Sequence, residues 1–354
     1  MRLPLAEHGY GAHPAVLPPD DPTRHDNDAV PMPVRLALYR KMQEMRLFEK
    51  RAYDLFMRQL VKGTTHLSLG MEAIAAGFGV AMRSDDLTFA TYRGHAHTLA
   101  RGVPMTPVLA ELLGRANGLM GGKGGSMHLT SVKHGVLGSY AIIGAHLTIA
   151  NGAAWSAQYR GSGQVTTCFF GDGTTNIGAF HEALNYAAVF QLPIVFVCEN
   201  NLYMEYTATA DITAVPRPAA DRASAYGLDP IVVDGNDADD VYQNATAAIQ
   251  RARAGGGPSL IEAVTYRHGG HSRADPGKYR PADEIEAWMK YDPITVYRGR
   301  LLRLGVDQAS IDRIDQDVTA EVEKATEEAV AGELPSPAAA MTDLWADGGS
   351  SWRN

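Results

Sequence analysis

The sequence predicts an α/β fold in which helices cover both faces of a parallel sheet. Short, continuous apolar runs such as VTTCFFG (165–171) and PIVFVCEN (193–200) are typical of buried parallel strands. A segment with helical periodicity, NIGAFHEALNYAAVFQ (176–191), lies between them. This alternation indicates a parallel sheet, because a helix is the usual connection between two parallel strands of one sheet.

Helices are expected before these strands. Residues 1–32 are rich in Pro, Asp and His and lack periodicity, so we expect a mobile arm there. Residues 34–63 carry apolar side chains at every third or fourth position and end at a glycine, which predicts a long amphipathic helix. Two shorter helices are predicted at 70–82 and 107–119.

The second half of the chain continues the alternation. Two further strands and the helix between them are predicted at 230–235, 259–267 and 239–255. The polar segment HGGHSRADPGKYRP (268–281) predicts a loop, and we expect it to be mobile without a ligand because almost no large apolar residue anchors it. The sequence from residue 283 is helical and charged, so we expect one α/β domain at 33–330 and a C-terminal tail at 331–354.

The composition narrows the class of protein. The chain has 354 residues, 45% of them hydrophobic and 20% charged, which is typical of a globular protein with a sizeable core. Its net charge of −8 argues against nucleic-acid binding, which needs a basic surface. The sequence contains no apolar run of about 18 residues, so it predicts no membrane span. It also has no recognisable secretory signal, and we therefore expect a cytoplasmic protein. Cys168 and Cys198 lie in apolar runs and are expected to be buried, reduced thiols.

The strongest functional signal is a pair of motifs at the ends of two successive strands, Gly-Asp-Gly at 171–173 and Asn-Asn at 200–201. Ligands of open α/β sheets bind at the carboxyl ends of strands, so both motifs should face one crevice. The Asp172 carboxylate, the Asn201 amide oxygen and a backbone carbonyl near Tyr203 would supply three of the roughly six oxygen ligands that Mg²⁺ prefers. Two diphosphate oxygens and a water would complete the set. Two unrelated tight turns are the alternative explanation.

Longer segments accompany these motifs: GTTHLSLGMEAIAAG (63–77), TYRGHAHTLARG (91–102), GGKGGSMHL (121–129) and TYRHGGHSRADPGKYR (265–280). Together they resemble the alpha subunit of the decarboxylating dehydrogenase component of 2-oxo acid dehydrogenase complexes, and equally the acetoin dehydrogenase alpha subunit. The resemblance covers residues 33–330 in order. It implies a thiamine-diphosphate-binding fold, with thiamine diphosphate and Mg²⁺ as cofactors.

The resemblance also assigns residues. Tyr92 and Arg93 match a pair that contacts the diphosphate, where a guanidinium can make two parallel bonds to phosphate oxygens. The metal ligands would be Asp172, Asn201 and Tyr203. The remaining cofactor contacts would come from Gly173, Thr174, His271 and the backbone of Ala141 and Ile143. His66 and His271 match two active-site histidines, whose imidazoles titrate near neutrality and donate protons. Core packing is the simpler explanation for the side chains of Ile142 and Ile143.

Other chains would have to complete the site. The resemblance places the glutamate that activates the cofactor on a pyrimidine-binding domain, which the sequence after residue 283 does not contain, so we expect a separate beta subunit. The implied reaction cleaves a small keto substrate, a 2-oxo acid or acetoin, and passes the acyl group to a lipoyl acyltransferase. A split transketolase and a regulatory subunit without catalysis remain alternatives. An NAD-binding fold is disfavoured because no G-x-G-x-x-G opens a helix after a first strand.

Overall fold

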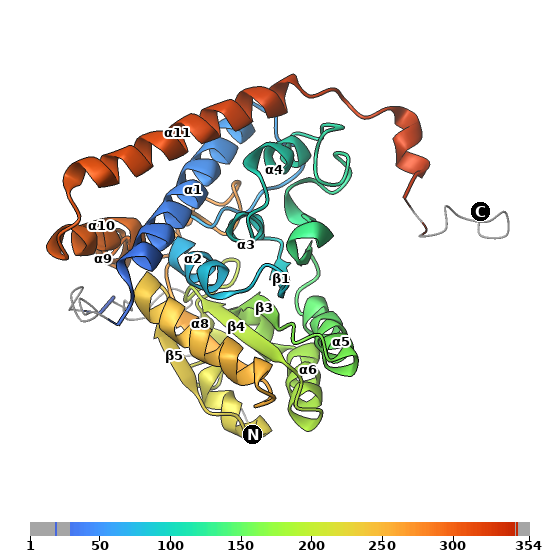
Figure 1. Cartoon of the computed structure of the whole chain (residues 1–354), viewed down its shortest axis with the longest axis vertical. Coiled ribbons are helices and arrows are strands. Elements are labelled where there is room, and N and C mark those ends of the chain that lie inside the picture. The colour runs from blue at the N-terminus through green and yellow to red at the C-terminus, as the bar shows by residue number, and fades with distance from the viewer. Residues whose placement is uncertain (1–17, 20–28, 344, 346–354) are drawn as a thin grey trace, which may run out of the picture.

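We describe residues 18–19, 29–343 and 345 of a computed structural model of the chain. Within them, six parallel strands form one sheet in the order β2-β1-β3-β4-β6-β5. The strands are β1 (Leu87–Thr91), β2 (Val136–Tyr140), β3 (Thr166–Gly171), β4 (Ile194–Asn200), β5 (Ile231–Asp234) and β6 (Ser259–Val264). The predicted α/β class is confirmed (Figure 1). Most of the arm expected at 1–32 and the end of the expected tail lie outside the described residues.

Helices precede, connect and follow the strands. The α-helices are α1 (Met32–Met57), α2 (Glu72–Ala81), α3 (His95–Ala100), α4 (Met105–Leu112), α5 (Ala145–Arg160), α6 (Gly178–Val189), α7 (Thr209–Ile212), α8 (Ala238–Arg253), α9 (Ala282–Lys290), α10 (Pro293–Arg303) and α11 (Gln308–Ala331). Short 3₁₀ helices are η1 (Gly125–Met127), η2 (Val132–His134), η3 (Asp172–Asn176), η4 (Ala220–Tyr226) and η5 (Pro337–Met341). None of the described helices is long and apolar enough to cross a membrane.

Helices cover the central strands in two layers (Figure 1), and the side chains of these strands alternate between the two layers. Cys168 and Phe170 of β3 pack with residues of α5 and α6, whereas Phe169 packs with residues of α2 and α8. The alternation follows from the geometry of a strand, in which successive side chains point to opposite faces. Because both faces are covered, every residue of β4 is buried, which accounts for the apolar run that predicts this strand. The two cysteines are buried and free, as expected.

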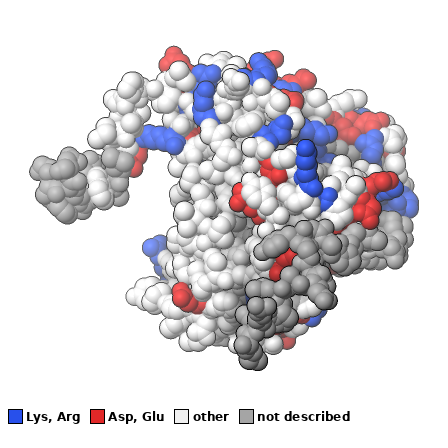
Figure 2. All heavy atoms as spheres, turned by 180° about the vertical axis from the view of Figure 1, so that it is seen from behind, with Lys and Arg blue, Asp and Glu red and all other residues white. Residues whose placement is uncertain are grey.

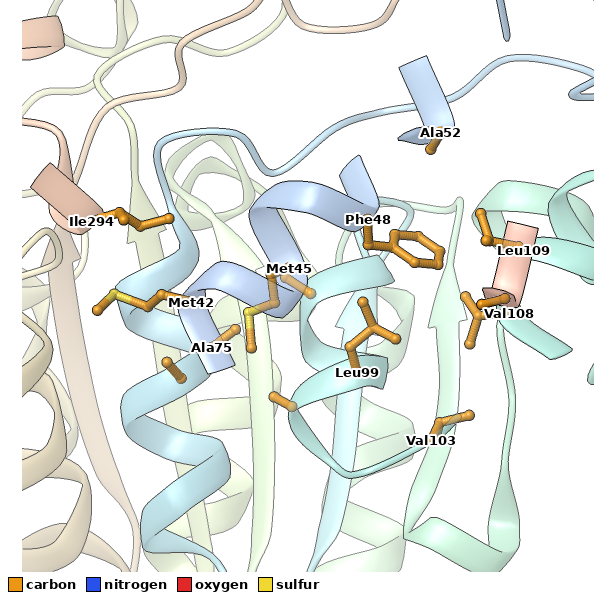
Figure 3. Close-up of a cluster of buried hydrophobic side chains, with 14 of the residues drawn as sticks. Met42, Met45, Phe48, Ala52, Ala75, Leu99, Val103, Val108, Leu109 and Ile294 are labelled. Atoms are coloured by element: carbon orange, nitrogen blue, oxygen red, sulfur yellow. The ribbon is translucent and has the colours of Figure 1, made fainter. Parts of the chain in front are cut away.

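A further helical layer lies outside α2 and α3. Met42, Met45 and Phe48 follow one stripe of α1 and pack with Leu99 of α3 and Leu109 of α4 (Figure 3). The outer side of α1 lies against α11 (Figure 1). This core anchors the start of α3, which directly follows the segment that carries two predicted site residues.

Two helices end earlier than the sequence predicts. α1 stops at Met57 and not at Gly63, because Gln59 adopts a left-handed φ of 60° and the Leu60 N–H returns to the Leu55 carbonyl. α4 stops at Leu112 in the same way, with Gly114 at φ 65°. This is the hydrogen-bond pattern of a Schellman cap. The strands β1 and β2 and the helix α3 are not predicted by the sequence.

Candidate active site

The candidate site lies at the carboxyl ends of β1, β3 and β4. The strand order reverses between β1 and β3, since β2 lies on the other side of β1, and such a switch point is where open α/β sheets bind ligands. A cavity of about 360 Å³ opens there. The predicted residues in its lining are Tyr92, Arg93, Ala141, Ile143, Asp172, Gly173, Thr174, Asn201, Tyr203 and His271. His66 is outside the lining but adjoins it through ring contacts.

Asp172 occupies the first turn after β3, and its side chain is only 2% exposed. One carboxylate oxygen accepts a hydrogen bond from the Gly173 N–H at 2.8 Å, and the other accepts one from the Thr209 hydroxyl at 2.7 Å. Burial raises the pKa of the Asp172 carboxyl, although both hydrogen bonds oppose the shift. A buried carboxylate of this kind favours a cation beside it, because nearby positive charge stabilises the ionised form.

The two asparagines at the end of β4 have different roles, since Asn200 is the last residue of the strand and Asn201 follows it. Asn200 is a scaffold residue: its amide N–H donates to Glu262 at 2.8 Å, and its side-chain oxygen accepts from the Leu202 N–H at 3.0 Å. Among the described residues, the Asn201 side-chain oxygen accepts one longer bond of 3.3 Å, from the Tyr203 N–H. An amide oxygen has two lone pairs, so it can also bind a metal ion. Leu202, which directly follows the pair, turns the chain toward Tyr203 with a φ of 71°.

Two buried guanidinium groups line the cavity. Arg93 donates hydrogen bonds to the carbonyl oxygens of Leu67 and His271. Arg267, to which the sequence assigns no specific role, donates to the Gly269 carbonyl at 3.2 Å and to the Tyr279 hydroxyl at 3.0 Å. Burial and then the charge of Arg93 lower the pKa of Arg267 to about 10. Two neighbouring cations in a low-dielectric cavity favour an anionic ligand.

Three aromatic side chains meet beside the cavity. The His66 ring lies 4.4 Å from the Tyr92 ring and 5.1 Å from the His271 ring, measured between centroids. Burial, followed by the charge of Arg93, lowers the pKa of His66 to about 3 and that of His271 to about 4. Both imidazoles are therefore neutral near pH 7. The His66 Nδ1 is buried and has no hydrogen-bond partner among the described residues.

The turn between β2 and α5 carries Ala141 and Ile143 into the lining. The expectation of core packing is wrong here, since Ile142 is 71% exposed and Ile143 is 40% exposed. Apolar residues predict burial only on average, and an exposed pair beside a cavity is an informative exception.

Sequence reasoning misses several residues of the lining: Met71, Glu199, Met204 and Glu205. Met204 explains one glycine of the Gly-Asp-Gly motif, because a Cβ at Gly173 would lie 2.5 Å from the Met204 sulfur. The sequence does hold a signal for Arg267, since this residue is the last one of the predicted strand at 259–267. His128 is exposed, and His146 is buried with its Nε2 donating to the Phe169 carbonyl at 2.8 Å, so neither lines this cavity.

The loop at 268–281 has more anchors than the sequence predicts. Arg273 lies over the Tyr53 ring and donates to its hydroxyl at 2.7 Å. Arg280 is buried and donates to the carbonyl oxygens of Arg267 and His268. Aromatic and guanidinium groups thus take the place of the aliphatic anchors that the loop lacks.

These features fit a metal-bound diphosphate. The cavity offers a buried carboxylate and an amide oxygen, which are ligands that Mg²⁺ prefers. It also offers two guanidinium groups, which donate hydrogen bonds to phosphate oxygens. The sequence assignments of individual contacts stay predictions.

The similarity of the sequence to known proteins identifies the family of this chain. The sequence model of the dehydrogenase E1 component family matches residues 40–338. The chain is 42% identical to the alpha subunit of acetoin:2,6-dichlorophenolindophenol oxidoreductase from Bacillus subtilis, over 88% of this chain and 93% of that protein. It is 40% identical to the pyruvate dehydrogenase E1 component subunit alpha of Porphyra purpurea, over 87% and 91%. It is 38% identical to the chloroplastic pyruvate dehydrogenase E1 component subunit alpha-3 of Oryza sativa, over 92% of this chain and 79% of that protein. The chain therefore belongs to the dehydrogenase E1 component family, which uses thiamine diphosphate.

Proposed function

We propose that this chain is the alpha subunit of an acetoin or 2-oxo acid dehydrogenase and that its cavity holds the cofactor diphosphate together with Mg²⁺. The observation that carries the proposal is the convergence of Asp172 and Asn201 with the buried guanidinium groups of Arg93 and Arg267 in one cavity. Carboxylate and amide oxygens suit Mg²⁺, and guanidinium groups bind phosphate.

Each group has a distinct task in this proposal. Asp172, Asn201 and the Tyr203 carbonyl bind Mg²⁺, while Gly173 and Thr174 bring backbone against the diphosphate. Tyr92 would donate a hydrogen bond to a phosphate oxygen, and the guanidinium groups of Arg93 and Arg267 would balance the negative charge of the diphosphate. The turn with Ala141 and Ile143 holds the aminopyrimidine through its backbone.

Thiamine diphosphate supplies a carbon nucleophile and an electron sink for cleaving the bond beside a keto group. The chain orients the reactants, excludes water and provides hydrogen-bond donors. His66 and His271 are neutral near pH 7, because burial lowers the pKa of each imidazole. Each can donate its ring N–H to a substrate oxygen, and neither needs to lose a charge to do so.

We infer that a beta subunit covers the open side of the cavity. The exposed Ile142 and Ile143 adjoin the N-terminus of α5, and the apolar surface continues along α5 and α6. It consists of Ile149, Trp155, Tyr159, Val189 and Phe190, which are exposed. The flank with these helices carries few charged side chains (Figure 2, lower left). Exposed apolar side chains that gather beside a cavity often mark a contact with another protein, so a partner is expected there.

The test is an assay of the alpha chain produced together with its beta chain. Oxidative cleavage of acetoin, pyruvate or a branched 2-oxo acid that requires thiamine diphosphate, Mg²⁺ and a lipoyl acyltransferase supports the proposal. Ketol transfer between sugar phosphates would instead favour a split transketolase. A pair that is inactive with every substrate would favour a regulatory subunit.

A further inference from the structure

A short hairpin after β4 carries Glu205 to the edge of the cavity. Tyr203 and Ala208 form an antiparallel bridge, and the Met204 N–H donates to the Thr207 carbonyl at 3.0 Å. Glu205 therefore lies at the tip of the hairpin. It is exposed and yet belongs to the lining, so its carboxylate stands where the cavity meets the solvent.

Both ends of this hairpin are held at the proposed metal site. At its start, the Tyr203 N–H donates to the side-chain oxygen of Asn201 at 3.3 Å. Just after its end, the Thr209 hydroxyl donates to the Asp172 carboxylate at 2.7 Å. The hairpin therefore keeps Glu205 in a fixed place relative to the residues that are proposed to bind the cofactor.

The charge of Glu205 reaches the aromatic side chains beside the cavity. Burial raises the pKa of the Tyr92 hydroxyl, and the negative charge of Glu205 is one of the contributions that add to this rise. The Tyr92 ring lies 4.4 Å from the His66 ring and 5.6 Å from the His271 ring, measured between centroids. These two imidazoles are the groups that the proposed function places against the substrate. The field of Glu205 therefore extends to the part of the cavity where a substrate would bind.

The cations of the cavity have other partners. Arg93 and Arg267 donate to carbonyl and hydroxyl oxygens, and in the proposed function both balance the diphosphate. The Glu199 carboxylate, which also lines the cavity, pairs with His97 at 3.1 Å. Within the part of the chain that the structure describes, no lysine or arginine forms an ion pair with Glu205. Because like charges repel, a carboxylate without such a partner disfavours an anion that approaches it.

We propose that Glu205 is a specificity-determining residue, whose carboxylate at the edge of the cavity favours neutral hydroxyketones such as acetoin over anionic 2-oxo acids. The inference rests on the proposed function, which leaves both substrate classes open. A 2-oxo acid brings its own carboxylate toward that of Glu205 and is repelled. Acetoin has an uncharged hydroxyethyl group in the place of that carboxylate, so it enters without this repulsion. Specificity of this kind comes from an element that acts against the wrong ligand.

A comparison of pyruvate with acetoin on the assembled alpha and beta enzyme tests the inference. Glu205→Gln keeps the size of the side chain and removes its charge. We expect the ratio of kcat/KM for pyruvate to kcat/KM for acetoin to rise at least about fivefold, because facing like charges suppress the wrong partner. Glu205→Lys reverses the charge and should raise the ratio further. Added salt should raise the ratio in the parent enzyme more than in Glu205→Gln, since ions screen the repulsion.

Glu327→Gln is the matched control, since it removes the same charge from an exposed position on α11 outside the lining and should leave the ratio unchanged. The Kd for thiamine diphosphate, measured by calorimetric titration, should not follow the ratio, which separates substrate choice from an effect on the cofactor site. A ratio that both Glu205 variants leave unchanged would overturn the inference, and so would a parent enzyme that prefers pyruvate to acetoin. A parent enzyme that cleaves neither acetoin nor any 2-oxo acid would instead refute the proposed function.

Discussion

Asp172 is the residue on which the metal site depends, because it is the one acidic side chain of the proposed ligand set. Asp172→Asn keeps the shape and removes the charge that balances a dication. We expect the affinity of the assembled enzyme for thiamine diphosphate with Mg²⁺ to fall at least tenfold, measured by calorimetric titration. Asp229→Asn is the control, since Asp229 is exposed and outside the lining. An unchanged affinity of the Asp172 variant would contradict the proposed metal site.

His146 makes stability depend on pH. Burial lowers the pKa of His146 to about 4, whereas an unfolded histidine has a pKa near 6.5. The unfolded chain therefore binds a proton between these values that the folded chain rejects, so this histidine destabilises the fold as the pH falls through that window. His146→Gln keeps a donor for the Phe169 carbonyl and cannot titrate. Its melting temperature should fall less than that of the parent between about pH 7 and pH 5.

The control for this measurement is His128→Gln, a change at an exposed histidine. It should reproduce the pH profile of the parent chain. If His146→Gln loses stability with falling pH as steeply as the parent, another group is responsible for the acid sensitivity.

The residues of the site differ in how far the sequence can predict them. Asp172 and Asn201 are predictable because each directly follows an apolar run, and the ends of parallel strands share one edge of the sheet. Arg267 is harder to predict, since an arginine in sequence is most often a surface residue. The exposure of Ile142 cannot be predicted from the sequence of one chain, because the surface that we infer to cover it would belong to the beta subunit.

Among the elements, the loop at 268–281 yields a test of local order. Its trypsin sites differ in structure: Lys278 is exposed, whereas Arg280 is buried and Arg273 lies over the Tyr53 ring. Trypsin should therefore cut the assembled enzyme first after Lys278. Thiamine diphosphate with Mg²⁺ should slow that cut severalfold, since ligand contacts at His271 add to the anchors of the loop.

Mass spectrometry of the early fragments would identify the first cut. Initial cleavage after Arg273 or Arg280 would contradict the anchoring described for the loop. Equal rates with and without the cofactor would show that His271 and its neighbours gain no stability from it.

The two strands that the sequence misses, β1 and β2, have a common physical cause. Thr88 and Thr91 are buried in β1, and Ser139 is buried in β2. Their hydroxyls interrupt the apolar runs by which the other strands are recognised. The Ser139 hydroxyl accepts from the Leu129 N–H at 2.7 Å, a long-range contact that no local pattern reveals. The strands β3, β4 and β6 are predictable because apolar residues dominate their buried positions.

For the whole molecule, the face of α5 and α6 yields a test of assembly. Trp155 is 50% exposed and stacks on Phe190 at 6.1 Å between ring centroids. Trp155→Asp places a charge in the centre of the inferred contact, which is costly to bury without a partner. The variant alpha chain should remain folded but fail to co-purify with the beta chain, as judged by size-exclusion chromatography.

Met289→Asp is the comparison, because Met289 is 47% exposed on α9 and lies outside that face. It should assemble as the parent does. Normal assembly of Trp155→Asp would place the beta subunit on another surface.

The reversal of strand order between β1 and β3 brings segments from Tyr92 to His271 to one cavity, so the site exists only when the entire sheet is formed. A ligand that binds only the folded chain adds its binding free energy to the stability of all these strands, about 2.7 kcal/mol at a hundred times its Kd. The cellular concentration of thiamine diphosphate would then affect how long the protein survives before it is degraded, in addition to its activity. Cells starved of thiamine should degrade this chain faster than well-fed cells do.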